Sequence, residues 1–117
     1  MTEPLHKAIN GREFYPTQTR YVVKITEKEY DLLMACSHRM DIGGIAYYLR
    51  SKSHATGDVH LARTKFCHGI AFDLRREDDD ESNRDHIGHL IQTYITLSWE
   101  YAHANNLASY VEGRRVV

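Results

Sequence analysis

Histidines are the residues of this chain whose spacing could support metal chemistry. His86 and His89 lie three residues apart, and Glu100 and His103 repeat that spacing further along the same expected helix. Residues three apart share one face of a helix, so each pair could offer two ligands to one ion. The two pairs cannot cooperate, because His89 and His103 would be about 21 Å apart along the helix axis. A catalytic zinc ion needs three protein ligands, so we predict no metal site and no cofactor.

A second set of residues could support nucleophilic chemistry. Asp58, His60, Cys67 and His68 would converge if residues 58–74 formed a hairpin. A carboxylate, an imidazole and a thiol are the parts of a nucleophilic site. However, a histidine on an apolar strand face is more often a hydrogen-bonded core residue, and the small neighbours of Cys67 are typical of packing. A small metal- or cysteine-dependent enzyme is therefore our second alternative, and we assign no catalytic residue.

An acidic run follows Arg75 and Arg76, and its function could be to bind a cation or a basic partner. Its members are Glu77, Asp78, Asp79, Asp80 and Glu81. The run lacks the glycine and the alternating spacing of an EF-hand calcium loop. Such runs are usually solvated loops. Docking to a basic protein surface is the use we expect if the loop is functional, so we include all five residues in a partner-binding site.

Three strands are expected to form the scaffold. Tyr21, Val23 and Ile25 alternate with more polar positions in residues 19–25, which indicates a strand. Residues 59–64 and 65–74 look like two further strands that form a hairpin. In the second of these, Phe66, His68, Ile70, Phe72 and Leu74 share one face, and Cys67, Gly69, Ala71 and Asp73 share the other.

Three helices are expected beside these strands. Thr26 and Glu29 form a capping box, which predicts a helix that ends near Arg39. Asp41 can cap a short second helix over residues 42–52, although two glycines weaken its start. Ser82 with Asp85 begins the last helix, over about 83–108, whose length would be about 39 Å.

The order of strand, capped helix, turn and helix over residues 19–52 loosely resembles that of ribbon-helix-helix repressors. In that family, polar strand residues enter the major groove of DNA, so the resemblance implies that Arg20 and Lys24 contact bases. Residues 19–65 carry eight Lys/Arg against five Asp/Glu, an excess of positive charge that permits phosphate contact. The resemblance covers less than a third of the chain, and Val22 is a poor base reader. A DNA-binding regulator is our first alternative function.

Composition places the chain among single globular domains. It has 117 residues, of which 42% are hydrophobic and 26% charged, and its formal net charge is −1. Two cysteines without a CxxC pattern do not make a disulfide framework. The N-terminus has no apolar signal core, and no apolar run approaches the length of a membrane span. We therefore expect a cytoplasmic protein that does not insert into membranes.

The expected last helix carries more apolar surface than one packing layer needs. Its apolar residues are Ile87, Leu90, Ile91, Tyr94, Ile95, Leu97, Trp99, Tyr101 and Ala102. They spread over roughly 200° of the helix circumference, whereas a helix on one sheet face needs little more than about 100°. Either the helix lies centrally in the core, or part of the arc meets another chain. For the second case we assign Tyr94, Trp99 and Tyr101 to the partner-binding site, because aromatic residues dominate protein interfaces.

We predict an α+β fold in which a small antiparallel sheet of about three strands packs against two or three helices, the last of them long. Residues 1–18 should form an irregular arm, 19–110 the domain and 111–117 a tail. The expected function is a non-enzymatic protein–protein interaction module, an adaptor or inhibitor that forms a homodimer. Small chains without catalytic signatures are common among accessory proteins of phages and mobile elements, which is a general expectation for such chains.

Overall fold

A computed structural model describes residues 3–17, 20–65 and 67–113 of the chain. Its sheet has five antiparallel strands in the order β1-β2-β3-β5-β4. The strands are β1 (His6–Lys7), β2 (Glu13–Pro16), β3 (Tyr21–Ile25), β4 (Thr56–Arg63) and β5 (His68–Asp73). The helices are α1 (Glu27–Ala35), α2 (Ile45–Lys52), the 3₁₀ turn η1 (Arg76–Asp78), α3 (Glu81–Ala104) and α4 (Ala108–Gly113).

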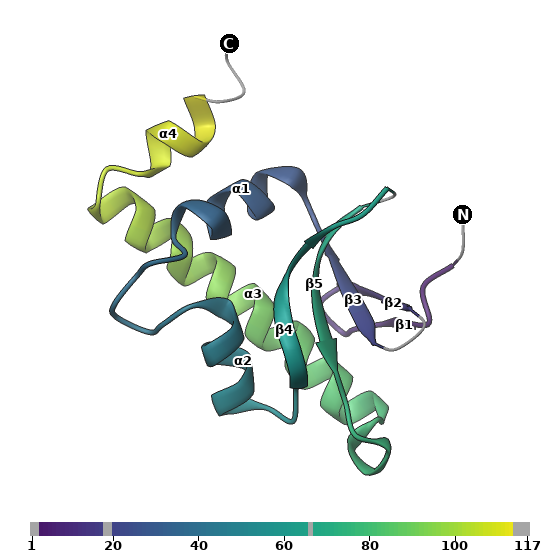
Figure 1. The fold of residues 1–117 in the computed structure, drawn as a ribbon. Helices are drawn as coiled ribbons and strands as arrows, with labels where there is room; N and C mark the ends of the chain where they lie inside the picture. Colours follow the sequence, from purple (N-terminus) through teal and green to yellow (C-terminus); the bar gives the residue numbers. More distant parts are fainter. Residues whose placement is uncertain (1–2, 18–19, 66, 114–117) are drawn as a thin grey trace.

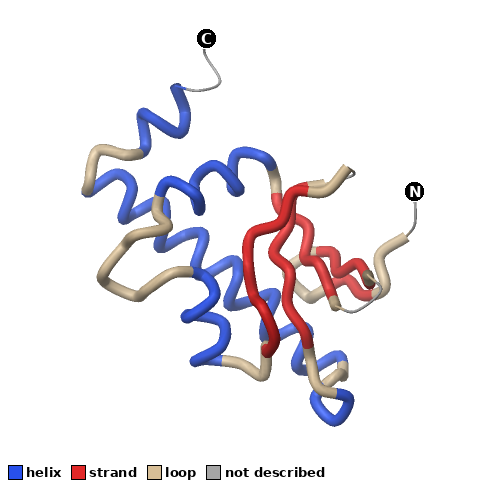
Figure 2. Tube along the Cα trace, viewed as in Figure 1, coloured by secondary structure: helices blue, strands red, loops and turns tan. Residues whose placement is uncertain are grey.

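The helices pack on one face of the sheet, and the core lies between the two layers. Figure 1 shows α3 crossing behind the strands with α1 and α2 beside it, and Figure 2 separates the helical and strand layers by colour. Strand residues such as Val23, Ile70 and Phe72 point into this core and are fully buried. The fold is α+β with a long helix near its C-terminus, as predicted. Among the described helices, none combines the length and the apolar character needed to cross a bilayer.

The prediction of about three strands was too low. The two additional strands, β1 and β2, lie in residues 1–18, which we expected to be irregular. Phe14 pairs with Val23 and is fully buried, so β2 extends the sheet and closes one end of the core. Strands this short contain too few residues for an alternating pattern to be recognised in the sequence. They are stabilised by their contacts with the rest of the sheet and with α3, which the local sequence does not reveal.

Helix α1 begins as predicted but ends early. The Thr26 hydroxyl accepts from the Glu29 backbone N–H, and the Glu29 carboxylate accepts from the Thr26 N–H, which confirms the capping box. The helix stops at Ala35 instead of near Arg39, because the Arg39 side chain turns into the core. The prediction that Asp41 caps α2 was wrong: Gly44 is the N-cap residue, and Asp41 pairs with Arg39.

Helix α3 starts slightly earlier than predicted. Asp80 is its N-cap and accepts from the Asn83 backbone N–H, so neither Ser82 nor Asp85 begins it. The helix ends at Ala104, and Asn106 has a positive φ of 60° that reverses the chain into α4. Of the predicted tail, residues 111–113 belong to α4, and 114–117 lie outside the described residues.

Candidate functional site

The strand register separates the predicted nucleophilic residues. His60 lies opposite Ala71 and His68 lies opposite Arg63 in the β4–β5 pair, so the two imidazoles are on opposite faces of the sheet. Cys67 directly precedes β5 and is four residues away from Ala71, the residue opposite His60. At the rise per residue of a strand, Cys67 and His60 are therefore about 13 Å apart along the sheet. The Cys67 thiol and the His60 imidazole do not meet.

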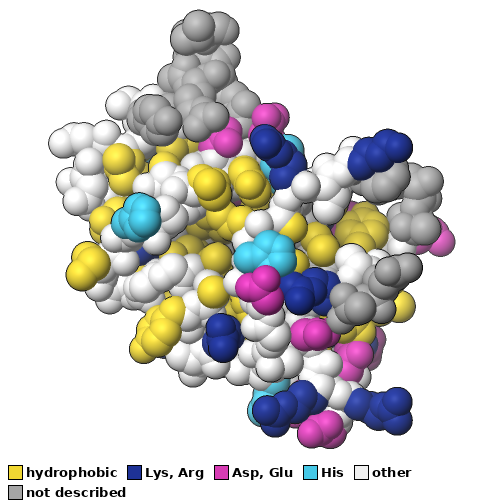
Figure 3. All heavy atoms as spheres, viewed as in Figure 1, with side chains coloured by type: hydrophobic (Ala, Val, Ile, Leu, Met, Phe, Trp, Pro, Cys, Tyr) yellow, Lys and Arg dark blue, Asp and Glu magenta, His cyan; other side chains and the backbone are white. Residues whose placement is uncertain are grey.

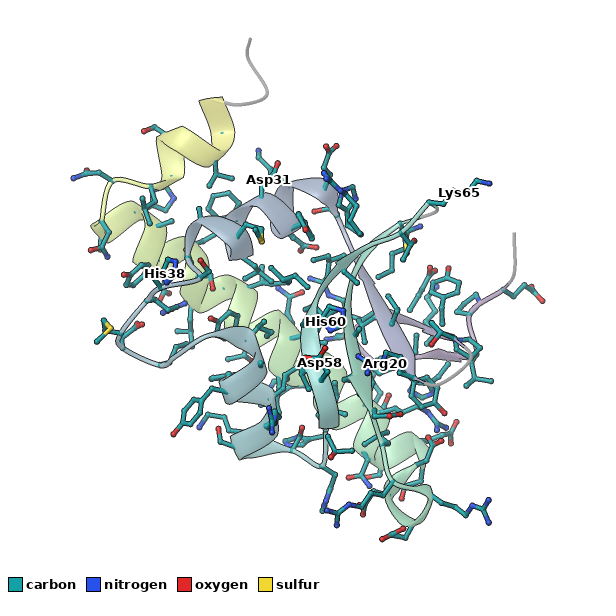
Figure 4. The ribbon with its side chains drawn as sticks, in the orientation of Figure 1. Arg20, Asp31, His38, Asp58, His60 and Lys65 are labelled. Atoms are coloured by element: carbon teal, nitrogen blue, oxygen red, sulfur yellow. The ribbon has the colours of Figure 1, made fainter. Side chains whose placement is uncertain are left out.

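Asp58 and His60 do lie together, with Arg20 from β3 (Figure 4). The Arg20 guanidinium donates to the Asp58 carbonyl at 2.7 Å, and His60 Nδ1 lies 2.8 Å from the same oxygen. The Asp58 carboxylate is 3.5 Å from His60 Nδ1, but its side chain is 81% exposed. This is a solvent-exposed polar cluster on the open sheet face.

Three other histidines have separate structural contacts. His68 packs its ring against Tyr30 with centroids 5.0 Å apart, and His103 lies 6.2 Å from the Trp99 ring. His86 Nε2 is 2.9 Å from the Lys52 carbonyl oxygen. Within the described ranges, no group of three His, Cys, Asp or Glu side chains is arranged to hold a metal ion.

Three of the five residues of the acidic run have internal partners. Asp80 caps α3, and Asp79 pairs with Arg84 and accepts from the Tyr21 hydroxyl at 2.6 Å. Asp78 lies 3.6 Å from His54 Nδ1. The run thus fastens the end of β5 to α3 and to β3, a structural use that the sequence pattern did not indicate. Its docking role stays a prediction.

The two residues predicted to contact DNA lie on the open sheet face. Arg20 is half-buried and engaged with Asp58, whereas Lys24 is exposed. Strand β3, which carries them, lies between β2 and β5 in the middle of the sheet. In this fold β3 is already paired on both sides, so it cannot form a two-stranded ribbon with a second chain.

The wide apolar arc of α3 is covered largely by the chain itself. Helices α1, α2 and α4 and strand β1 all contact α3. Tyr94 is 2% exposed and belongs to the core, whereas Trp99 and Tyr101 are half-buried and pack against the edge of that core. Of the three aromatic residues predicted to bind a partner, only Trp99 and Tyr101 therefore reach the surface.

A buried arginine holds the loop that connects α1 and α2. Arg39 is 5% exposed and donates to both carboxylate oxygens of Asp41, at 2.7 and 2.6 Å. It also donates to the Ser98 hydroxyl at 2.9 Å, and its guanidinium lies over the Tyr101 ring at 4.7 Å. Burying a guanidinium costs free energy unless such partners compensate for lost hydration. This set of contacts determines the path of the loop.

A tyrosine supports the same loop from beneath, and the ionisable groups around it have shifted pKa values. The Tyr94 hydroxyl donates to the Gly43 carbonyl at 2.8 Å, and burial raises the pKa of Tyr94 to about 12. The hydrogen bond from Arg39 lowers the pKa of Asp41 to about 2, and burial raises the pKa of the Cys36 thiol. Each shift moves the pKa further from neutral pH, so Tyr94 and Cys36 stay neutral and Asp41 stays charged over a wider pH range, which suits a static clamp.

The clamped loop and the first turn of α2 present apolar side chains to solvent. Met40 is 93% exposed and Tyr47 is 68% exposed, while Ile42 between them is half-buried. The Tyr47 ring covers Gly43, where an added Cβ would lie 2.8 Å from Tyr47 Cδ2. We call Met40, Ile42 and Tyr47 the Met40 surface. Figure 3 shows hydrophobic side chains over this loop and between α1 and α2, and in Figure 4 His38 lies on the same loop.

The Met40 surface was missed from the sequence. Its signal was present in MDIGGIAYY, residues 40–48, where large apolar residues flank a glycine pair. Glycines near a helix start can indicate a loop with fixed backbone geometry, and Gly43 has a φ of 78°. The contribution of Arg39 could not be foreseen, because its partner Ser98 is 59 residues away.

Two hollows on the described surface are small. One of about 200 Å³ is lined by polar residues that include His54, Arg75 and Asp78, and another of about 260 Å³ lies beside Arg12 and Lys24. Ligand pockets that enclose a cofactor or substrate usually span about 300–1,000 Å³ and are largely apolar. Both hollows are smaller than such pockets, and the smaller of the two is also mainly polar. Comparison with protein-family models, with curated proteins and with solved structures finds no match for this chain.

Proposed function

We propose that the protein is a non-enzymatic protein–protein interaction module, an adaptor or inhibitor, and that the Met40 surface is its contact region. The single observation that carries the proposal is the exposure of Met40, on a loop that a buried arginine fixes in place, and of Tyr47 in the adjoining first turn of α2. Methionine and aromatic residues are enriched at protein interfaces. A loop that is already ordered loses little conformational freedom when a partner binds.

The surroundings of the surface support this assignment. Tyr101, which the sequence analysis assigned to partner binding, borders the loop because its ring lies under the Arg39 guanidinium. Among the described residues, the large apolar side chains that are exposed elsewhere are those of Leu5 and Ile9 near the N-terminus and Met34 on α1. Scattered exposed apolar residues are common on proteins, so exposed apolar residues on a fixed loop and the helix turn that follows it are the more informative feature.

The test compares a Met40→Ser/Tyr47→Ser double variant with Ile9→Ser, a control that also replaces a highly exposed apolar residue. Both variants should keep the circular-dichroism spectrum of the wild type, because the replaced side chains are exposed. Proteins that co-purify with the wild-type chain from its native host should be lost from the double variant and retained by Ile9→Ser. Retention by both variants, or loss from both, would rule out the Met40 surface as the contact region.

A further inference from the structure

We propose that the outer edge of β4, from His60 to Arg63, binds an extended strand of another protein in antiparallel pairing. The bound strand places an apolar residue opposite Leu61 and an acidic residue opposite Arg63. This site uses residues that the Met40 surface does not contain, so the inference goes beyond the proposed function and is tested separately from it.

The two edges of the sheet differ in how open they are. At one edge, β1 is only two residues long and is in contact with α3. At the other edge, β4 has eight residues and is the longest of the described strands. Its pairing with β5 is irregular between Thr56 and His60, and Gly57 has a φ of 76°, features that protect the first half from further pairing. From His60 to Arg63 the register is regular, so a partner strand can pair there.

The backbone of this regular half points toward the free edge at two residues. The Thr64 N–H donates to the Cys67 carbonyl at 2.8 Å, in the same register as the β4–β5 pairs that precede it. Hydrogen-bonded pairs alternate along an antiparallel ladder with pairs whose backbone groups point outward. Leu61 and Arg63 therefore direct their N–H and C=O groups away from β5. Within the described chain these four groups have no hydrogen-bond partner, and such edge groups are a template for another strand.

The side chain of Leu61 determines which residue fits opposite it. Leu61 pairs with the buried Ile70 and packs half-buried against the core, so it lies on the helix side of the sheet. A partner residue opposite Leu61 lies on the same face. Figure 3 shows hydrophobic side chains on this face of the molecule, between α1 and α2. An apolar partner residue is therefore favoured opposite Leu61.

The side chain of Arg63 determines the second position. Arg63 is exposed, and its guanidinium lies 5.9 Å from the centre of the Tyr30 ring. None of the ion pairs among the described residues includes Arg63. Opposite charges at facing positions stabilise paired strands, so an acidic residue is favoured there. In antiparallel pairing this residue precedes the apolar residue by two positions.

A second copy of β4 does not provide this pattern. Pairing Leu61 with Leu61 of the second copy places Arg63 opposite Val59, which lies in the irregular half. Pairing Arg63 with Arg63 brings two like charges together, which is destabilising. The register between these two places Leu61 opposite Arg63. The favoured occupant is therefore a strand of a different protein.

A peptide titration followed by NMR tests the inference. The probe is acetyl-Thr-Glu-Thr-Val-Thr-amide, added to the full chain up to millimolar concentration because a single short strand binds weakly. We expect the largest amide shifts at residues 60–63. N-methylation of the valine removes the N–H that would donate to the Leu61 carbonyl, and binding should weaken at least about tenfold. N-methylation of the central threonine is the matched control and should leave binding unchanged, because that N–H points away from β4.

A charge exchange tests the position of the acidic residue. The wild type should bind the glutamate peptide about twofold to fivefold more tightly than the same peptide with lysine in place of glutamate. Arg63→Glu should reverse this preference. Arg76→Glu, which makes the same charge change at an exposed position on η1, should keep the wild-type preference.

Four results would overturn the inference. The first is the absence of shifts at residues 60–63 with millimolar glutamate peptide. The second is an equal effect of the two N-methylations, because backbone pairing requires only one of the two N–H groups. The third is a preference that Arg63→Glu leaves unchanged or that Arg76→Glu also reverses. The fourth is a concentration-dependent shift of the same amides without peptide, which would show that a second copy occupies the edge.

Discussion

Arg39 and Asp41 form a two-bond ion pair in which the guanidinium is buried and the carboxylate is half-exposed. The pair closes a short turn and leaves the remaining guanidinium nitrogen to reach Ser98 in α3. One side chain thereby joins the loop after α1 to the longest helix. The exposure of Met40 follows, because the residue between the paired ones points away from the core.

Replacing Arg39 by methionine should loosen this loop. The variant removes the bonds to Asp41 and Ser98 but keeps much of the apolar stem, so we expect a loss of about 1–3 kcal/mol in the free energy of unfolding. Urea denaturation measures the loss, and hydrogen exchange should show faster exchange at residues 40–43. Arg50→Met, at an exposed position, should change neither quantity. An Arg39→Met variant as stable as the wild type would show that the clamp contributes nothing.

The Asp41 pair should make part of the stability depend on pH. The pKa of Asp41 falls from 3.8 to about 2 in the folded protein, so its contribution is complete above about pH 4 and is lost as the pH falls through about 2. After allowance for solvent screening we expect about 1 kcal/mol. The difference in unfolding free energy between wild type and Asp41→Asn should therefore shrink from pH 5 to pH 2. A difference that is constant over that interval contradicts the assigned pair.

The acidic run should be partly structural. Asp80→Ala removes the N-cap of α3 and should cost about 1 kcal/mol, seen as a lower melting temperature. Glu77→Gln, in the same run but exposed, should leave the melting temperature unchanged. If the two substitutions have equal effects, the run is acting only through its overall charge.

Gly69 should tolerate no side chain. It lies between β3 and β4, and an added Cβ would be 2.3 Å from Val22 Cγ1 and 2.8 Å from the Val23 carbonyl oxygen. Because a backbone atom is among those contacts, strand β3 itself must shift, at a cost of about 1–3 kcal/mol. Chemical denaturation of Gly69→Ala measures this cost. Wild-type stability in that variant would mean that the β3–β5 spacing is wider than described.

Local sequence signals predicted the elements that local chemistry determines. The Thr26–Glu29 capping box set the start of α1, and alternation of Tyr21, Val23 and Ile25 identified the central strand. The wide apolar arc correctly marked α3 as a helix with contacts on several sides. The arc could not show whether the apolar residues of α3 pack against helices of the same chain or against another chain. The width of an apolar arc does not identify what packs on it.

Features that depend on distant contacts were missed. Strands β1 and β2 are held in place by pairs such as Phe14 with Val23 and by the ion pair of Arg12 with Glu29, neither of which leaves a local pattern. The early end of α1 depends on Arg39 reaching Ser98. The start of α3 was missed for a local reason, because its N-cap residue Asp80 resembles its acidic neighbours in sequence. The separation of His60 from Cys67 required the strand register.

Site-specific photo-crosslinking tests the central claim most directly, because it reports contact at one position without depending on stability. A benzophenone amino acid is placed at position 47 on the Met40 surface or at the control position 9, which is even more exposed and lies near the N-terminus. The account predicts a crosslinked protein adduct from position 47, formed with the purified chain or with host proteins, and none from position 9. Adducts from position 9 alone, or from neither position, would contradict a binding surface at Met40.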